Sequence, residues 1–153
     1  SMSWPSNYDK LACATMNSIF WAGDRLVPDI RPLAGDTESM QGLLQNSFIR
    51  AMATLARTLR GVPSILGFET PNEPHPGWLG CDDLTKPQLG PLKSGQSPLE
   101  QLQRCGGDAG VWRGGRCLWA RAGVWEEASG KCLDPSRFRC GNWMAECFAP
   151  FVR

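Results

Sequence analysis

The chain has 153 residues, 42% of them hydrophobic, so it has mass for one domain that could bury about two thirds of its surface. Its 16 Lys and Arg residues nearly balance 15 Asp and Glu, and the formal net charge is +1. This charge gives no basic field for nucleic acid or an anionic membrane. No apolar run approaches the length of a membrane-spanning helix, and no signal-peptide pattern is found. We therefore expect no nucleic-acid partner and no stable membrane insertion.

Seven cysteines are spread along the chain without a Cys-x-x-Cys pair, and there is one His. Because this spacing matches no zinc site, no metal is predicted. The cysteines are interpreted as free, buried thiols in a reducing environment, with a disulfide framework as the alternative. A cytoplasmic location is the prediction that follows.

The first 35 residues show little regular pattern. Residues 11–20 could form one or two helical turns, and Pro28 and Pro32 then interrupt the chain. Phe20 and Trp21 are expected either in the core or in the wall of a cleft.

A helix is predicted next, with Asp36 or Thr37 as its N-cap and Gly61 as its stop signal. Glu38 would lie in the first turn. Apolar residues recur at spacings of three and four, which is typical of a helix face buried in a core. These residues are Met40, Leu43, Leu44, Phe48, Met52, Leu55, Ala56 and Leu59.

A short apolar run, residues 64–68, lies between Pro63 and Pro71 and predicts a buried strand. Helix, glycine and strand together make one step of a parallel α/β layer. Such a strand needs parallel neighbours on both sides, and the sequence contains no other strand of comparable quality. Asn72-Glu73-Pro74 follows the run, where barrel enzymes carry their catalytic groups.

The stretch from Trp78 to Trp125 is rich in Pro and Gly and is predicted to be a long ordered loop over a cleft, with a short helix starting after Ser97. Aromatic faces suit sugar rings and sterol or ceramide bodies. The alternative is that the tryptophans only hold the loop together. Near the end of the chain, the apolar spacing predicts the start of another helix, whose apolar face would need a partner.

Three blocks of sequence together resemble a known family. The pattern Gly-Phe-Glu-x-x-Asn-Glu-Pro at residues 67–74 resembles the fourth-strand signature of clan A glycoside hydrolases, family five in particular. Residues 7–16 with 20–24, and Asn-Glu-Pro-His-Pro-Gly at 72–77, are similar to the fungal steryl-β-glucosidase and endoglycoceramidase-related glucosylceramidase branch. The resemblance runs from about Trp4 to Arg153.

The resemblance implies an α/β fold that is a partial (β/α)₈ TIM-barrel segment and not a complete barrel, which takes about 250 residues. Residues 1–153 would form one partial catalytic domain. Residues 1–35 would be the loop after the third strand, 36–70 the third helix and fourth strand, 71–125 the substrate-side loop, and 126–153 the start of the following helix. Unpaired edges would favour self-association or pairing with the missing barrel half.

The resemblance also implies the chemistry. Retaining glycosidases use two carboxyl groups about 5–5.5 Å apart, one as acid/base and one as nucleophile. Glu73 would be the acid/base and Asn72 the contact to the sugar 2-hydroxyl. His75 would either line the sugar pocket or form a turn. Trp78 and Trp119 would complete the substrate-binding set.

The remaining carboxylates receive supporting roles. Glu69 is interpreted as structural, and Asp82 and Asp83 as residues that stabilise the loop. No residue matches the family nucleophile, because none of Glu126, Glu127 and Glu146 sits in a strand-end context that matches the motif.

The leading hypothesis is therefore a retaining β-glucosidase for steryl β-glucosides or glucosylceramide, with no cofactor, that is almost inactive as this segment alone. One alternative is a non-catalytic carbohydrate- or lipid-binding or interaction module derived from a truncated glycosidase. A weaker one is an unrelated small α+β domain in which Asn-Glu-Pro is accidental.

Overall fold

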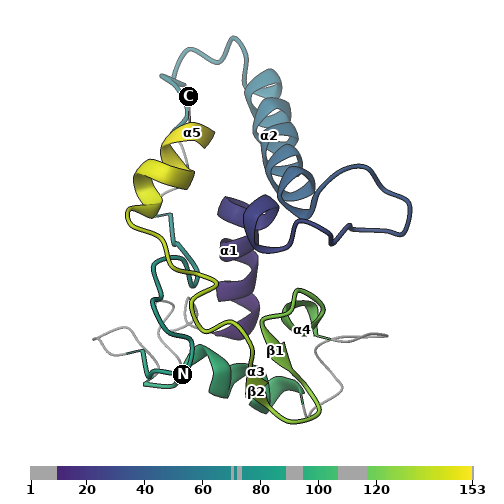
Figure 1. Cartoon of the computed structure of the whole chain (residues 1–153). Coiled ribbons are helices and arrows are strands. Elements are labelled where there is room, and N and C mark those ends of the chain that lie inside the picture. Colours follow the sequence, from purple (N-terminus) through teal and green to yellow (C-terminus); the bar gives the residue numbers. More distant parts are fainter. Residues whose placement is uncertain (1–9, 70, 72–73, 89–94, 107–116, 153) are drawn as a thin grey trace.

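The computed structural model describes residues 10–69, 71, 74–88, 95–106 and 117–152 (Figure 1). The described part is rich in helix and contains no closed barrel. Its one sheet is a short antiparallel hairpin in which Trp125 pairs with Cys132 and Glu126 with Lys131. In chain order the elements are α1 (Leu11–Leu26), α2 (Met40–Thr58), α3 (Pro98–Gly106), α4 (Leu118–Arg121), β1 (Trp125–Glu126), β2 (Lys131–Cys132), the π-helical turn η2 (Met144–Phe148) and α5 (Ala149–Phe151).

Helix α1 is the central element, and it is longer than the one or two turns expected from sequence. Its buried apolar residues include Leu11, Ile19 and Leu26, and they recur at helical spacing along one face. The helix is kinked at Ala22, which has a φ of −145°. Trp21 is buried, which confirms the core interpretation of the Phe20-Trp21 pair for the tryptophan.

Three aromatic rings fill the core beside α1. The ring centroids of Trp119 and Phe138 lie 4.8 Å apart, and Trp78 lies 5.3 Å from Phe138 and 5.8 Å from Trp119. The rings meet at tilted or edge-on angles, which aromatic pairs prefer. Because Trp78 and Trp119 are 41 residues apart in the numbering, this cluster closes the long loop onto α1.

Helix α2 confirms the prediction of a helix after residue 36, but its N-cap was predicted wrongly. Ser39 is the cap, and its hydroxyl accepts a hydrogen bond of 2.9 Å from the Gly42 N–H. Gly61 has a φ of +85° just beyond the helix, as a helix stop requires. Asp36 instead accepts a bond from the Leu33 N–H in the preceding loop, so it is not available to cap.

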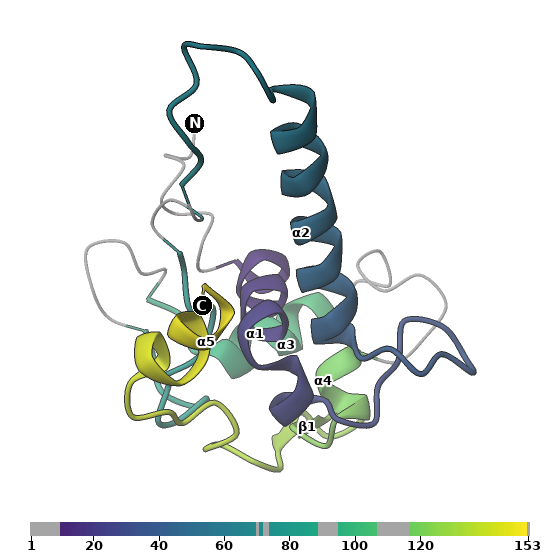
Figure 2. The same cartoon turned by 90° about the horizontal axis from the view of Figure 1, so that it is seen from above.

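The prediction that the apolar face of α2 is buried is wrong for most of the helix. No residue of α2 is fully buried, and Leu55 is 44% exposed. The first turns pack on α1, where Gln45 donates to the Phe20 carbonyl at 2.7 Å. The outer turns project beyond the other helices (Figure 2). No described element packs on that part of the face, which is why it stays exposed.

The predicted strand at residues 64–68 is also absent from the described structure. The segment has no regular hydrogen-bonded structure, and Leu66 is fully exposed. The physical reason is that an apolar parallel strand is stable only between parallel neighbours. No such neighbour is present among the described residues.

The predicted C-terminal helix is confirmed, since η2 and α5 form a continuous helical stretch. The partners that its apolar face needs lie within the chain. Phe151 lies 5.2 Å from Phe20 and 5.5 Å from Trp21 between ring centroids, and Phe148 lies 5.4 Å from Trp21. Aromatic contacts therefore hold this stretch on α1.

Candidate functional site

The Asn-Glu-Pro motif is only partly visible. Asn72 and Glu73, the predicted sugar contact and acid/base, lie outside the described residues. Pro71 and Pro74 flank them and are half-buried, and the described chain resumes at Pro74 and continues into His75. The site is therefore built from the elements that hold these flanks.

His75 is fixed by two hydrogen bonds. Its backbone carbonyl accepts the indole N–H of Trp21 at 2.9 Å, and its Nδ1 accepts the backbone N–H of Gly77 at 3.0 Å. An imidazole nitrogen that accepts carries no proton, so in the neutral ring the proton is on Nε2. The side chain thus forms part of the turn.

Gly77 and Trp78 attach the end of the motif to α1. The Trp78 N–H donates to the buried Ser18 hydroxyl at 2.8 Å. Gly77 has a φ of +67°, and a Cβ there would collide with the Ala14 carbonyl and the Ser18 hydroxyl. Only glycine tolerates both the backbone angle and this close approach. The chain downstream of Glu73 is therefore held at a fixed position against α1.

The two tryptophans predicted to bind substrate are inside the protein. Trp78 is 5% exposed and Trp119 is fully buried. The Trp119 indole N–H donates to the Thr15 hydroxyl at 2.9 Å, so its polar edge is occupied as well. In this structure the rings present no face to a ligand, and they hold the loop together, as the alternative interpretation states.

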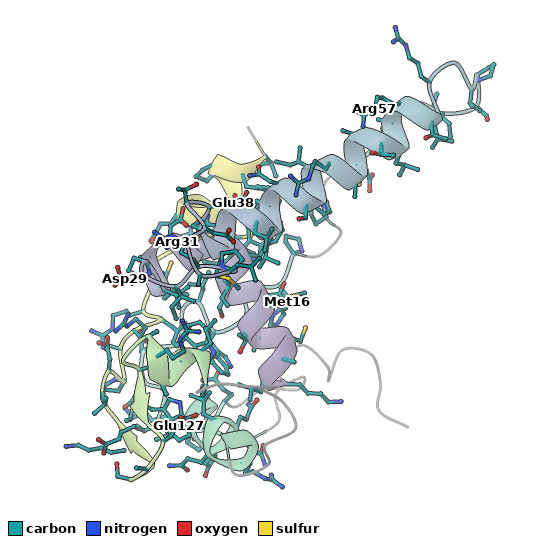
Figure 3. The ribbon with its side chains drawn as sticks, turned by 90° about the vertical axis from the view of Figure 1, so that its right-hand side faces the viewer. Met16, Asp29, Arg31, Glu38, Arg57 and Glu127 are labelled. Atoms are coloured by element: carbon teal, nitrogen blue, oxygen red, sulfur yellow. The ribbon has the colours of Figure 1, made fainter. Side chains whose placement is uncertain are left out.

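The three carboxylates considered as nucleophiles each accept a hydrogen bond from another residue of this chain. Glu127 accepts the Cys117 N–H at 2.8 Å, and Glu126 accepts the Ser129 hydroxyl at 2.5 Å. Glu146 accepts the Asn142 N–H at 3.0 Å and the Cys140 thiol at 3.1 Å. Glu127 lies in the hairpin, at the opposite end of the molecule from Arg57 on α2 (Figure 3).

The contacts of Glu146 shift its own pKa and that of Cys140. The hydrogen bonds from Asn142 and Cys140 lower the pKa of Glu146, which stays ionised. Burial, together with the adjacent Glu146, raises the pKa of Cys140 to about 11, so that thiol is a neutral donor. A carboxyl group that must donate a proton needs the opposite shift, and Glu146 is thus unsuited to acid catalysis.

The acidic residues of the loop stabilise it. Asp83 accepts the Thr85 N–H at 2.9 Å and the Thr85 hydroxyl at 2.6 Å, and these bonds lower the pKa of Asp83. Asp82 lies 3.4 Å from the Arg139 guanidinium. Glu69 is exposed beside Phe68 and Pro71 at the rim of an apolar groove.

The described residues hold no cluster of three or more His, Cys, Asp or Glu side chains that could bind a metal ion. Five of the described cysteines are free thiols, namely Cys81, Cys117, Cys132, Cys140 and Cys147. No described helix is both long enough and apolar enough to cross a membrane.

Sequence reasoning missed the polar anchors on α1. Thr15 and Ser18 are 5% and 0% exposed, yet each is hydrogen-bonded to a tryptophan of the loop. The signal was present, because Leu11, Thr15 and Ser18 share one helix face with the apolar residues. Buried hydroxyls on an apolar face imply bonds to a distant partner.

Comparison with known proteins gives a consistent result. No protein-family profile matches the chain. The chain is 43% identical over 83 residues to a glucosylceramidase of Rhizopus delemar, covering 54% of this chain and 12% of that protein. It is 28% identical over 165 residues to a glucosylceramidase of Cryptococcus neoformans, and this match covers 84% of this chain and 22% of that protein. It is 37% identical over 105 residues to the ergosteryl-beta-glucosidase of Saccharomyces cerevisiae, and this match covers 63% of this chain and 13% of that protein.

The fold also matches solved structures. Two crystal structures of sterylglucosidase 1 from Cryptococcus neoformans superpose on 99% of this chain with TM-scores of 0.80 and 0.81, at 22% sequence identity. The matched part is 29% and 30% of those chains. The described fold is therefore a segment of a glycosidase fold.

The sequence matches identify which glycosidases the chain is related to. The chain is related to the fungal steryl glucosidases and glucosylceramidases, and it corresponds to a segment of them. It spans less than a quarter of the length of these curated relatives.

Proposed function

We propose that the chain is the acid/base-carrying segment of a retaining β-glucosidase that acts on glucosylated lipids, either a steryl β-glucoside or glucosylceramide. The observation that carries this proposal is the sequence similarity to proteins named glucosylceramidase and ergosteryl-beta-glucosidase, together with the Asn72-Glu73-Pro74 motif. The fixed turn from His75 to Trp78 supports it, because a catalytic carboxyl group needs a rigid support.

In the proposed reaction, Glu73 donates a proton to the glycosidic oxygen while a second carboxylate attacks the sugar carbon. The lipid alcohol leaves, and a covalent glucosyl intermediate remains. Glu73 then takes a proton from water, which hydrolyses the intermediate. Asn72 binds the sugar 2-hydroxyl, a contact that strengthens in the transition state.

We assign the nucleophile to a group outside the described part of this chain. Glu126, Glu127 and Glu146 support this assignment, since each already accepts a hydrogen bond from another residue of this chain. Glu73 alone cannot complete double displacement, so the segment alone is expected to hydrolyse almost nothing. We place α2 and residues 64–68 at the third helix and fourth strand of a (β/α)₈ barrel.

The second candidate function is a non-catalytic binding or interaction module. The apolar groove between α2 and residues 68–71 favours it, because such a surface binds apolar partners without any nucleophile. We place the protein in the cytoplasm, and the free thiols of Cys81, Cys117, Cys132, Cys140 and Cys147 support this placement.

The catalytic proposal is tested with a chimaeric enzyme, called the transplant below. Residues 4–153 of this chain replace the matched segment of sterylglucosidase 1 from Cryptococcus neoformans, which superposes on 99% of the chain, and release of glucose from ergosteryl glucoside and glucosylceramide is measured. Glu73→Gln should lower the rate by about 10²–10⁴-fold. The loss should be smaller on a fluorogenic glucoside whose leaving group needs no proton.

Glu69→Gln is the matched control, four residues away, and should retain activity. If Glu73→Gln were as active as the transplant itself on both lipid glucosides, the acid/base proposal would be wrong. If the transplant released glucose from only one of the two lipids, that result would name the substrate.

A further inference from the structure

One polar atom inside the described structure has no partner. The indole nitrogen of Trp125 is buried and makes no hydrogen bond, and among the described residues it is the one buried side-chain nitrogen or oxygen in that condition. Trp125 as a whole is 3% exposed. The indole groups of Trp21 and Trp119, by contrast, each donate to an oxygen. A buried N–H group without an acceptor costs free energy and is rare in native proteins, so this one needs an explanation.

Trp125 lines a pocket beside the hairpin of β1 and β2. The pocket has a volume of about 380 Å³, which is within the size range of small-molecule sites. Its described lining combines one aromatic, two acidic and three aliphatic side chains, namely Trp125, Glu126, Glu127, Ala120, Ala128 and Leu133. The label of Glu127 marks its position in Figure 3. None of residues 74–78 is among them, so the pocket is separate from the turn that follows Glu73.

The two carboxylates of the pocket each have an oxygen to spare. Glu126 uses Oε2 to accept the Ser129 hydroxyl at 2.5 Å, and Glu127 uses Oε1 to accept the Cys117 N–H at 2.8 Å. The second oxygen of each carboxylate has no hydrogen bond to any described residue. The bonds that are made orient the two side chains. The pocket therefore offers one donor and two acceptors next to apolar surface.

These groups restrict the chemistry of an occupant. An ammonium or guanidinium group would suit the carboxylates, but it has no acceptor for the indole N–H of Trp125. An anion could accept that N–H, but Glu126 and Glu127 would repel it. A hydroxyl group both accepts and donates, and a sugar ring adds an apolar face that can pack on Trp125 and Leu133. An uncharged sugar therefore suits the donor, the acceptors and the apolar surface together.

We propose that this pocket binds an uncharged sugar, with one hydroxyl oxygen accepting the Trp125 N–H and other hydroxyls donating to Glu126 and Glu127. The preference for a neutral, hydroxyl-rich ligand follows from the pocket itself. That the sugar is a glucosyl group rests on the proposed function. The ligand is bound here without any bond being broken.

The experiment titrates the full 153-residue chain, isotope-labelled for NMR, with methyl β-D-glucoside. The indole N–H signal of Trp125 is assigned by its loss in Trp125→Phe, and we expect it to shift saturably in the unchanged chain. Trp125→Phe keeps an aromatic ring but removes the donor, so it should weaken binding about tenfold or more. Its affinity is measured from the backbone amide signals of residues 126–128.

Ala128→Leu is a second variant that does not touch the core. Ala128 is exposed and lines the pocket, so a larger side chain there should fill part of the pocket and weaken binding at least about tenfold. Ala51→Leu is the matched control, because Ala51 is exposed on α2 and is not among the described pocket-lining residues. This variant should bind the glucoside like the unchanged chain.

Equal affinity of all these variants, or a Trp125 signal that does not respond to the glucoside, would overturn the proposal. So would a stronger response to N-methylacetamide or to methylammonium, which would mean that the pocket takes an amide or a cation. A response lost in Asn72→Ala but kept in Ala128→Leu would place the sugar at the Asn-Glu-Pro motif, which overturns this pocket and supports the proposed function.

Two further arms separate the pocket from catalysis and identify the source of the sugar. An unchanged Trp125 response in a Glu73→Gln chain would support the pocket whether or not the catalytic proposal holds. Phosphatidylcholine vesicles with glucosylceramide, compared with vesicles without it, distinguish a lipid-borne glucosyl group from a free one. A response to either glucosylated probe that Ala128→Leu abolishes would support the proposal.

Discussion

Trp119 donates its indole N–H to the hydroxyl of Thr15 at 2.9 Å, across 104 residues of sequence and inside the core. Both side chains are buried, so neither group has water as a substitute partner. The bond joins α1 to the short helix α4, and the Trp119 ring packs on Phe138 beside it. Loop and helix are thereby joined inside the core.

Thr15→Val should remove this bond and destabilise the protein by about 1–3 kcal/mol, because the indole N–H is left buried without a partner. The free energy of unfolding in urea measures the change. Thr58→Val is the matched control, since its hydroxyl bonds within an exposed helix turn and its loss should cost less than about 0.5 kcal/mol. Equal effects of the two substitutions would show that the Trp119 bond contributes nothing special.

Gly77→Ala should destabilise the protein by more than about 2 kcal/mol, because it adds a steric collision with α1 to the strain of a positive φ. Gly35→Ala separates the two effects. Gly35 has a φ of +91° but open space around it, so its substitution should cost only about 1 kcal/mol of strain. Melting temperatures of both variants measure this, and a Gly77 variant as stable as the Gly35 variant would contradict the close approach.

Leu26→Ala and Leu55→Ala should differ sharply. Leu26 is fully buried in α1, and its truncation should cost about 2–5 kcal/mol. Leu55 is 44% exposed on α2, and its truncation should cost less than about 1 kcal/mol. Denaturant midpoints of the isolated chain give both values. A loss of several kcal/mol at Leu55 would mean that the outer turns of α2 are packed against something.

Stability should fall as the pH rises from 9 to 11. The pKa of Cys140 is raised from 9.0 to about 11 in the folded protein, so above pH 9 the unfolded chain releases this proton more readily than the folded one. The stabilising contribution is complete below pH 9 and is lost as the pH passes 11. Cys140→Ser should flatten part of this slope, measured as unfolding free energy against pH.

How far the sequence predicts this structure depends on where the stabilising partners lie. The helix starting after Ser97 was predicted from its cap, and in the structure the Ser97 hydroxyl accepts the Glu100 N–H at 3.1 Å while Glu100 accepts the Ser97 N–H at 2.7 Å. The two partners are three residues apart, so the pattern contained all that was needed.

The apolar run at residues 64–68 shows the opposite case. Its pattern is that of a buried parallel strand, but such a strand depends on neighbours distant in sequence, and the described chain supplies none. The candidate site divides in the same way. The motif was readable from the sequence, but the bonds from Trp21 and Ser18 that hold its downstream side depend on tertiary packing.

The exposed α2 and the buried attachment of Gly77 and Trp78 have a consequence for proteolysis. A protease added to the folded chain should cut first between Thr58 and Pro71, where the backbone is exposed and bonded only within tight turns. Cleavage there would separate α2 from the segment that carries His75, but Trp21 and Ser18 would still hold that segment on α1. A nicked molecule would thus keep its aromatic core and lose the groove.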